Sequence, residues 1–382
     1  MIITTRRVLL HLDKLSTGLA QQDTFAQKKD KQMAEKQEIS LSILKKRWLK
    51  FKTLKRGYYS FILLVILYGL SWFLPLLINN RALIVSYESE LYFPVVSGYH
   101  AGSEFGQDVP GEAIYRELKA TWKADDSNNW LLLPPYPYSP FEDITVQGNK
   151  MFDEPSRVHW LGTDNTGRDV FARLCYAFNI SISFALVLTT LNYILGVLIG
   201  GSMGYLGGKF DLFFQRLIEI WSSLPMLFVI IIISSIIRPS FFLLIFIYTI
   251  VNWIGMTYLM RAEFYREKSK DYVAAALSMG QTNFKVMFKH ILPNALVPII
   301  TYFPFAVVGG ITALVGLDYL GFGMPPPTPS WGQMLDVGLS NIPKWWMVFA
   351  PVSAQFVTLI MVVFIGEAVR EAFDPKVYSR LR

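Results

Sequence analysis

The side chains that most often carry out catalysis or bind metals are scattered along this chain of 382 residues. Its four histidines, His11, His100, His159 and His290, lie far apart in the sequence, so a metal site is not expected. The single cysteine, Cys175, excludes an internal disulfide and a cysteine cluster for metal. Neither a G-x-S-x-G nor an H-E-x-x-H arrangement occurs. These residues therefore do not predict an enzyme.

Two short stretches resemble ligand-binding loops but lack residues that such loops need. Gly207-Gly208-Lys209-Phe210 lacks the first glycine of a phosphate loop and the serine or threonine after Lys209. Asp164-Asn165-Thr166-Gly167 predicts a turn, but Thr166 and Arg168 stand where a calcium loop needs carboxylates or amides. We therefore expect no cofactor in this chain.

The composition is that of a membrane protein, with 52% hydrophobic and 17% charged residues and a mean hydropathy of +0.34. A helix of about 20 apolar residues crosses a hydrocarbon core of roughly 30 Å. Six stretches qualify, namely Tyr58–Ile78, Ile180–Tyr205, Leu217–Ile237, Phe241–Met260, Ala295–Val315 and Trp346–Gly366. The third and fourth must form a tight hairpin. The predicted fold class is an all-α polytopic membrane protein with six transmembrane helices.

Lys and Arg near the ends of the spans predict the orientation in the membrane. Residues 1–57 hold 14 Lys and Arg against 5 Asp and Glu, and residues 261–293 hold 6 against 3. Residues 81–178 hold 8 against 14. Both termini are therefore expected in the cytoplasm, and the acidic segment is expected outside it.

The expected division of the chain follows from these spans. It consists of a basic N-terminal extension (1–57), a first span (58–78), a periplasmic insertion of mixed structure (81–178), a five-helix core (179–368) with a cytoplasmic loop at 261–293, and a cytoplasmic tail (369–382). The net charge of +7 could indicate nucleic acid, but the basic residues lie next to a span. Anionic lipid is therefore the expected partner of the extension, and nucleic acid is not.

The loop at Asp271–Pro293 predicts two short helices. Asp271 can cap the first, Gly280 suits the left-handed position that ends it, and Pro293 is expected to stop the second, which covers Thr282–Ile291. Consecutive alanines give a thin helix that can enter a groove on another protein, or one that merely lies on the membrane. The residue pattern leaves both interpretations open.

This loop resembles the EAA loop of permease subunits of binding-protein-dependent ABC importers. That pattern reads Glu-Ala-Ala, three residues, Gly, nine residues, Ile, any residue and Leu-Pro. Its positions here are Ala274, Ala275, Ala276, Gly280, His290, Leu292 and Pro293. Ala274 replaces the Glu and His290 replaces the Ile, but alanine is the best helix former, so the helix is still expected. The resemblance implies that the loop, from Asp271 onward, is a coupling helix held by a P-loop ATPase.

Two further motifs resemble the peptide/nickel subgroup of these permeases. The segment before the second span is similar to a GTDxxGRDV signature, at Gly162, Thr163, Asp164, Gly167, Arg168 and Asp169. An amphipathic helix is expected to follow it, over Val170–Phe178. The last outer connection is similar to the subgroup's PPTPSWG segment, at Pro326, Pro327, Pro329, Ser330, Trp331 and Gly332. Its three successive prolines predict a polyproline-like strand, and Ser330 can cap a helix from Trp331.

The insertion resembles that of Yej-type permeases, which are associated with the uptake of oligopeptides and microcin C-like peptides. Ala82–Val95 alternates like a β-hairpin, and Asn129–Ile144 is rich in proline and aromatic residues. The likeness extends from about Leu44 to the C-terminus. A dipeptide, nickel or glutathione permease is the alternative within the subgroup. A proton-coupled transporter is less favoured, because no span carries a charge near its middle.

Small residues and prolines within the spans predict how the helices pack. Gly196, Gly200 and Gly204 follow one another at intervals of four, which lets helices approach closely, and we expect this packing within a pair of permeases. Pro225 is expected to kink the third span.

The resemblance also implies the partners of this chain. They are a second homologous permease, ATPase subunits that bind ATP and Mg, a periplasmic peptide-binding protein, the peptide itself and the lipid bilayer. The implied location is the bacterial inner membrane.

Overall fold

The computed structural model describes residues 43–125, 128–143 and 150–374. Residues 1–42 of the predicted N-terminal extension (1–57) and most of the predicted tail (369–382) lie outside these residues. The chain divides into two compact units, Met1–Lys55 with Glu371–Arg382, and Arg56–Arg370. In the smaller unit, the basic helix α2 (Ile43–Thr53) contacts the last turn of α16, with Lys50 Nζ 3.1 Å from Glu371 Oε1.

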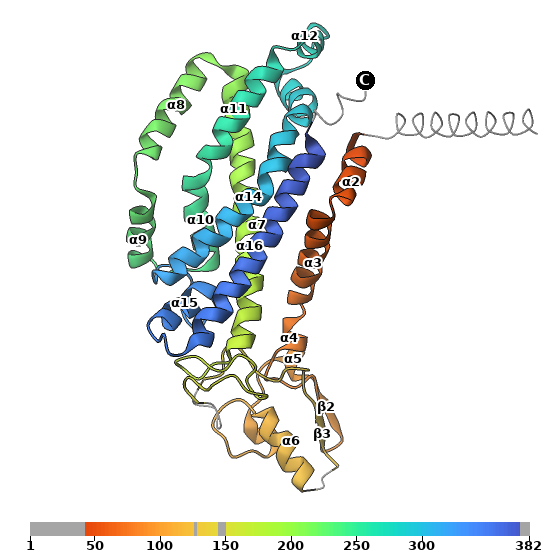
Figure 1. The fold of residues 1–382 in the computed structure, drawn as a ribbon, viewed down its shortest axis with the longest axis vertical. Helices are drawn as coiled ribbons and strands as arrows, with labels where there is room; N and C mark the ends of the chain where they lie inside the picture. The colour runs from red at the N-terminus through yellow and green to blue at the C-terminus, as the bar shows by residue number, and fades with distance from the viewer. Residues whose placement is uncertain (1–42, 126–127, 144–149, 375–382) are drawn as a thin grey trace, which may run out of the picture. The chain divides into compact units, whose positions relative to one another are not determined.

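The described chain is mostly helical (Figure 1). After α2, the elements in order are α3 (Lys55–Ser71), α4 (Leu74–Leu77), β1 (Ile84–Tyr87), β2 (Glu90–Tyr92), α5 (Pro94–Ser97), a 3-10 turn (Gly102–Phe105), α6 (Tyr115–Ala124), β3 (Trp130–Leu132), α7 (Val170–Leu206), α8 (Gly208–Ser222), α9 (Met226–Ile236), α10 (Phe241–Asn252), α11 (Ile254–Lys268), α12 (Asp271–Ser278), α13 (Asn283–Lys285), a π-helix (Val286–Ile291), α14 (Leu292–Tyr319), α15 (Trp331–Leu339) and α16 (Trp345–Phe373).

Within the described residues, three helices are long and apolar enough to cross a membrane: α7, the continuous helix Asn283–Tyr319, and α16. Two bent pairs raise this number to five if each pair is one span. The pair α8 and α9 is bent by 73° at the break that contains Pro225, which confirms the predicted interruption. The first predicted span, Tyr58–Ile78, falls short of a long helix, because α3 ends at Ser71 and a turn separates it from α4.

The third and fourth predicted spans meet in the expected hairpin. α9 ends at Ile236 and α10 begins at Phe241, with the Ser240 hydroxyl accepting from the Leu243 backbone N–H. α10 and α11 form the second bent pair, at 45°. The predicted fourth span therefore consists of two helices.

The segment between α4 and α7 forms a small folded insertion of mixed structure. β1 pairs antiparallel with β2 in the register Val85↔Tyr92, which confirms the predicted hairpin, and it pairs with β3 on its other side. α6 packs onto this sheet and buries Tyr115, Leu118 and Trp122. Arg116 of α6 donates two hydrogen bonds of 2.9 Å to the Glu142 carboxylate. These bonds join α6 to the segment that follows β3.

α7 is the central helix of the larger unit, and its glycines set its contact with α11. A β-carbon at position 200 would overlap the carbonyl oxygen of Thr257, and one at position 196 would lie 2.6 Å from the Met256 side chain. The close approach predicted from this glycine spacing is therefore made within the chain, between α7 and α11, rather than between two permeases. α7 also begins earlier than its predicted span: Val170–Phe178 is its first part, because no helix breaker follows Phe178.

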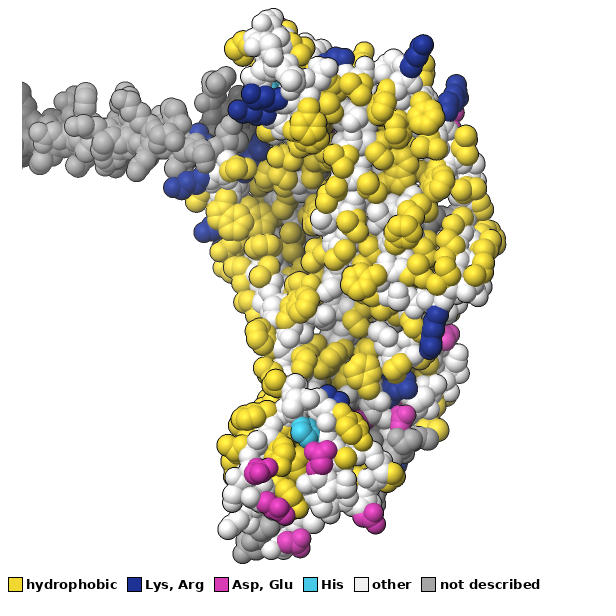
Figure 2. Space-filling model, turned by 180° about the vertical axis from the view of Figure 1, so that it is seen from behind, with side chains coloured by type: hydrophobic (Ala, Val, Ile, Leu, Met, Phe, Trp, Pro, Cys, Tyr) yellow, Lys and Arg dark blue, Asp and Glu magenta, His cyan; other side chains and the backbone are white. Residues whose placement is uncertain are grey.

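One face of the space-filling view shows how charge is distributed along the molecule (Figure 2). Hydrophobic side chains cover the helical part, whereas acidic side chains gather over the insertion. Exposed acidic residues of the insertion include Glu88, Glu90, Glu104 and Asp108. The helical part thus has the surface expected of a protein in lipid, and the insertion has the surface of a domain in water.

Candidate functional site

The predicted coupling loop contains the short helix α12. The C-terminal end of this helix agrees with the sequence-based prediction, and its N-terminal end does not. Gly280 has a φ of 76° just after the helix, which confirms its left-handed position. The capping prediction for Asp271 is wrong: Lys270 is the N-cap residue, and Asp271 is the first helical residue without a side-chain cap bond. An acidic residue in the first turn still interacts favourably with the helix dipole.

Pro293 does not stop the second helix of the loop, contrary to prediction. The turn Val286–Ile291 is a π-helix that runs directly into α14, where Pro293 occupies a position in the first turn. The π turn changes the hydrogen-bond register just before Pro293, and this lets the helix continue past a residue that has no backbone N–H. Asn283–Tyr319 is therefore one continuous helix.

The two faces of α12 have different surroundings. Val273 and Ala276 are buried in a core with Phe264 of α11 and Ile291 of the π-helix. Ala274 and Ala275 are exposed. The three alanines of the motif therefore divide, with one packed inward and two facing outward.

Large apolar side chains stand exposed around the outward alanines. Leu277 is 42% exposed, Met279 is 70% exposed and Phe284 is 71% exposed. We call these three residues, together with Ala274 and Ala275, the coupling surface. Exposed apolar side chains that lie near one another in the sequence can mark a contact with another protein or with lipid.

The loop is fastened to the helices on which it stands. The buried Glu267 carboxylate at the end of α11 accepts hydrogen bonds from Lys270 Nζ at 2.7 Å and from the Tyr272 hydroxyl at 2.8 Å. Burial raises the pKa of Tyr272, which keeps this hydroxyl protonated as a donor. The Tyr205 hydroxyl at the end of α7 donates to Asn283 Oδ1 at 2.8 Å. These hydrogen bonds connect the loop to the ends of α7 and α11.

Of the two remaining motif positions in the loop, His290 makes a specific contact. Its Nε2 lies 2.7 Å from Gln281 Oε1, across the turn after Gly280. Leu292 is partly buried against the same core as α12. His290 thus closes the loop with a polar bond at the position where the family pattern has an apolar residue.

The GTDxxGRDV segment lies at the opposite end of α7, where it builds the start of that helix. Asp164 Oδ1 accepts from the backbone N–H groups of Thr166 and Arg168, which holds the turn. Asp169 caps α7, since its Oδ1 accepts from the Ala172 N–H at 2.7 Å. A side chain at Gly162 would collide with the Asp153 carbonyl oxygen, and the Thr163 carbonyl accepts from Trp346 of α16.

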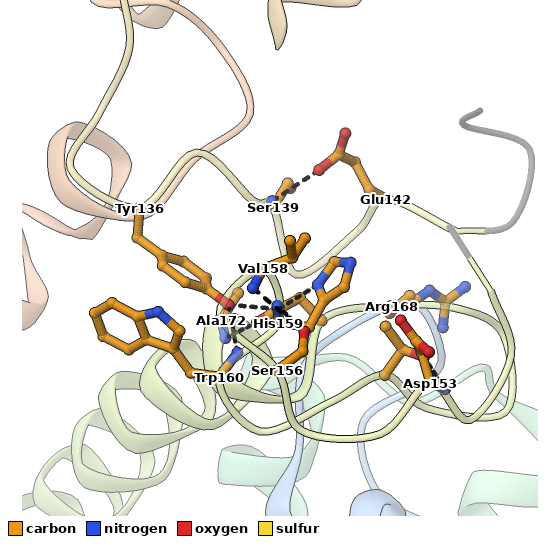
Figure 3. A network of polar contacts seen from close by, with 12 residues as sticks. Tyr136, Ser139, Glu142, Asp153, Ser156, Val158, His159, Trp160, Arg168 and Ala172 are labelled. Carbon is orange, nitrogen blue, oxygen red and sulfur yellow. Dashed lines mark hydrogen bonds and ion pairs between the residues drawn. The ribbon is translucent and has the colours of Figure 1, made fainter. Parts of the chain in front are cut away.

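A buried polar network connects this cap to the insertion (Figure 3). The Tyr136 hydroxyl donates to Asp169 Oδ2 at 2.6 Å, and His159 Nδ1 lies 2.8 Å from the same oxygen. Burial and the nearby Asp169 carboxylate raise the pKa of Tyr136, so it stays a donor. Sequence reasoning missed Tyr136 and His159, because 33 and 10 residues separate them from Asp169. The network fixes the insertion to α7.

The proline-rich segment packs beside the same end of α7. The Ser330 hydroxyl caps α15, as predicted, and donates to the buried Asp318 carboxylate at 2.6 Å. Trp331 Nε1 donates to the Leu174 carbonyl of α7, and a side chain at Gly332 would overlap the Val315 carbonyl oxygen. The predicted polyproline strand is wrong: a turn forms instead, in which the Thr328 N–H donates to the Pro325 carbonyl.

The predicted site residues therefore form two separate groups at the two ends of α7. The GTDxxGRDV and PPTPSWG segments come together around the start of α7, with Pro326, Pro327 and Pro329 in the turn that precedes α15. The loop of α12 lies beyond its end. Across the described ranges, no group of three or more His, Cys, Asp and Glu residues is placed to hold a metal ion.

Comparison with known proteins identifies the class to which this arrangement belongs. Residues 196–378 match the family described as the inner membrane component of binding-protein-dependent transport systems. Relatives that match over most of their length, described next, extend this assignment to 86–87% of the chain. The chain belongs to this family, and it is accordingly the membrane component of a transporter and not a catalytic subunit.

Particular relatives narrow the class. The peptidoglycan transport system permease protein YejE of Agrobacterium fabrum is 39% identical over 361 residues, which cover 87% of this chain and 93% of the relative. The inner membrane ABC transporter permease protein YejE of Escherichia coli is 40% identical over 330 residues, covering 86% and 96%. The dipeptide transport system permease protein DppC of Bacillus subtilis is 36% identical over 226 residues, covering 58% and 70%.

Proposed function

We propose that this chain is one permease subunit of an ATP-driven peptide importer of the bacterial inner membrane. In this proposal it crosses the membrane six times, with α3 and α4 as the first span and both termini in the cytoplasm. The insertion between α4 and α7 faces the periplasm and receives a peptide-binding protein. A second homologous permease completes the pathway, and ATPase subunits that bind ATP and Mg drive it.

The coupling surface is the observation that carries this proposal. Ala274 and Ala275 leave a shallow face between protruding Leu277, Met279 and Phe284, which suits insertion into an apolar cleft. The other face of α12 is packed into the core of the membrane helices. A force applied by an ATPase to this surface would therefore reach α7, α11 and α14 directly.

Peptide as the substrate is supported by the relatives and by the insertion. The relatives include permeases of peptidoglycan and dipeptide transport systems. The acidic, aromatic insertion is large enough to form its own core, as a docking surface for a separate binding protein requires.

The test is the substitution Ala275→Trp in the complete transporter, reconstituted with its second permease, ATPase and binding protein. Because Ala275 is exposed, the added bulk should block docking without disturbing the core of this chain. We expect peptide uptake and peptide-stimulated ATP hydrolysis to fall at least roughly tenfold, the size of effect that a misfitted interface centre produces, at an unchanged amount of inserted protein.

The control is Ala262→Trp, at an exposed alanine of α11 outside the coupling surface, which should transport normally. Ala276→Trp provides a contrast: because Ala276 is buried, it should lower the amount of folded protein as well. Full uptake by the Ala275→Trp transporter would contradict the proposed coupling.

A further inference from the structure

A cavity of about 570 Å³ lies among α7, α10, α11 and α14. Its walls are largely apolar and aromatic, with Tyr193, Tyr248, Met256 and Phe305 among them. None of its lining residues is Asp, Glu, Lys, Arg or His. The cavity therefore offers a neutral surface that cannot hold a metal ion or an ionised group by charge.

Asn192 differs from the apolar residues on these walls, because it carries a buried amide oxygen that lacks a hydrogen-bond partner among the described residues. Its side chain belongs to a residue that is only 8% exposed, near the middle of α7, and it lines the cavity. Its Oδ1 has no hydrogen-bond partner in the part of the chain that the structure describes. An unpaired buried amide oxygen is unfavourable, and a ligand that donates a hydrogen bond would relieve that cost.

Further polar groups line the same cavity. Thr189 lies almost one turn before Asn192 on α7, and Asn252 lies at the end of α10. An Asn side chain presents both a donor and an acceptor. Donors and acceptors at fixed places on apolar walls are typical of a small-molecule site.

Glycines leave open space on two of the walls. A β-carbon at Gly255 of α11 or at Gly309 of α14 would have no neighbouring atom within 4 Å. These glycines differ from Gly196 and Gly200 on α7, which pack tightly against α11. The cavity can therefore accept a chain with side chains of varied size.

We propose that Asn192, with Asn252, hydrogen-bonds the main chain of a transported peptide in this cavity. The inference rests on the proposed function. A peptide main chain offers alternate N–H and C=O groups that match an Asn amide, and it is common to every peptide whatever its side chains. Apolar and aromatic walls without charge accept varied side chains without holding any one of them tightly. The site thus selects for the peptide backbone.

The test uses the complete transporter in proteoliposomes, with radiolabelled tri-alanine as the probe and both uptake and ATP hydrolysis measured. We expect Asn192→Leu to lower tri-alanine uptake per ATP hydrolysed by about five- to tenfold, the effect of losing one buried hydrogen bond. ATP hydrolysis stimulated by the loaded binding protein should persist, because the coupling surface is untouched. Asn252→Leu, at an exposed residue, should lower the same ratio and decides the matter if the Asn192 variant fails to fold.

Thr190→Val is the matched control, since Thr190 lies on α7 next to the cavity residues but its hydroxyl is exposed and bonded to the Leu186 carbonyl. It should leave the ratio unchanged. An unchanged ratio in both asparagine variants overturns the proposal. A wild-type transporter that hydrolyses ATP but imports no tri-alanine overturns the proposed peptide function instead.

Discussion

At the scale of single residues, the contact between α7 and α11 depends on the absence of side chains. Gly200 faces the Thr257 carbonyl oxygen so closely that no β-carbon fits between them, and Gly204 faces the Arg261 carbonyl in the same way. Backbone atoms of a helix cannot yield as the end of a flexible side chain can. A methyl group at either position must therefore push the two helices apart.

We predict that Gly200→Ala lowers the free energy of unfolding of the purified protein in detergent by about 2 kcal/mol, the usual cost of overpacking. Gly69→Ala is the control, because a β-carbon there meets no atom within 4 Å, and it should not lower the free energy of unfolding, since Ala is the better helix former. Thermal unfolding of both variants measures the difference. Equal stability of the two would show that the helices separate freely.

Residue patterns predicted some of these local features and missed others. Gly280 and Ser330 were predictable, because a left-handed turn and an N-cap depend on neighbours in the sequence. The inward orientation of Ala276 was not, since three adjacent alanines are alike until the core that receives one of them is known. Tyr136 likewise reaches Asp169 only through the fold of the insertion.

At the scale of elements, the junction between α11 and α12 depends on one buried carboxylate. The Glu267 carboxylate accepts hydrogen bonds from Lys270, just before α12, and from Tyr272, within α12. These bonds span the junction between the two helices. Removing the carboxylate takes away the acceptor of the Tyr272 hydroxyl and the counter-ion of Lys270. α12 would then lose its fixed angle to α11.

We predict that Glu267→Ala speeds backbone hydrogen exchange in residues 271–278 about tenfold, as the loss of one charge-assisted hydrogen bond implies, and lowers peptide uptake. Glu219→Ala is the control, since its pair with Arg216 on α8 is exposed on both sides and contributes little. Mass spectrometry of exchanged peptides gives the comparison. Unchanged exchange in 271–278 would mean that core packing alone fixes α12.

Most elements were predictable because apolar runs of helix length dominate the sequence. The departures have local physical causes. A π turn carries the chain through Pro293, and the turn closed by Thr328 interrupts the predicted proline strand. α3 ends at Ser71, so the first predicted span is shorter than its apolar run.

At the scale of the whole molecule, the acidic insertion and the basic loop stand at opposite ends of α7. The insertion is fastened to the start of this helix through Asp169, and the loop is fastened to its end through Tyr205. If the helix crosses the membrane, these two regions must lie on opposite sides. The positive-inside bias predicts that the loop lies on the cytoplasmic side.

We predict that a cysteine at Ser278, in a chain with Cys175→Ser, reacts with a membrane-impermeant maleimide only from the cytoplasmic side. A cysteine at Ser103 of the insertion should react only from the outer side. Both serines are exposed, so access to the reagent depends on the side alone. Labelling of sealed vesicles in both orientations makes the measurement, and reaction of both positions from one side would contradict the six-span topology.

The polar groups on the walls of the cavity could not be predicted from any sequence pattern. Asn192 and Asn252 belong to separate helices and follow no motif, and only the assembled bundle places them on the same walls.

The continuity of α7 has a mechanical consequence. Its 37 residues form an uninterrupted helix, about 55 Å long at about 1.5 Å per residue. A rod of that length that tilts by about 5° around one end moves its other end by roughly 5 Å, close to the pitch of one helical turn. A small rocking motion at the loop therefore becomes a displacement at the insertion as large as a side chain, with no intermediate hinge to absorb it.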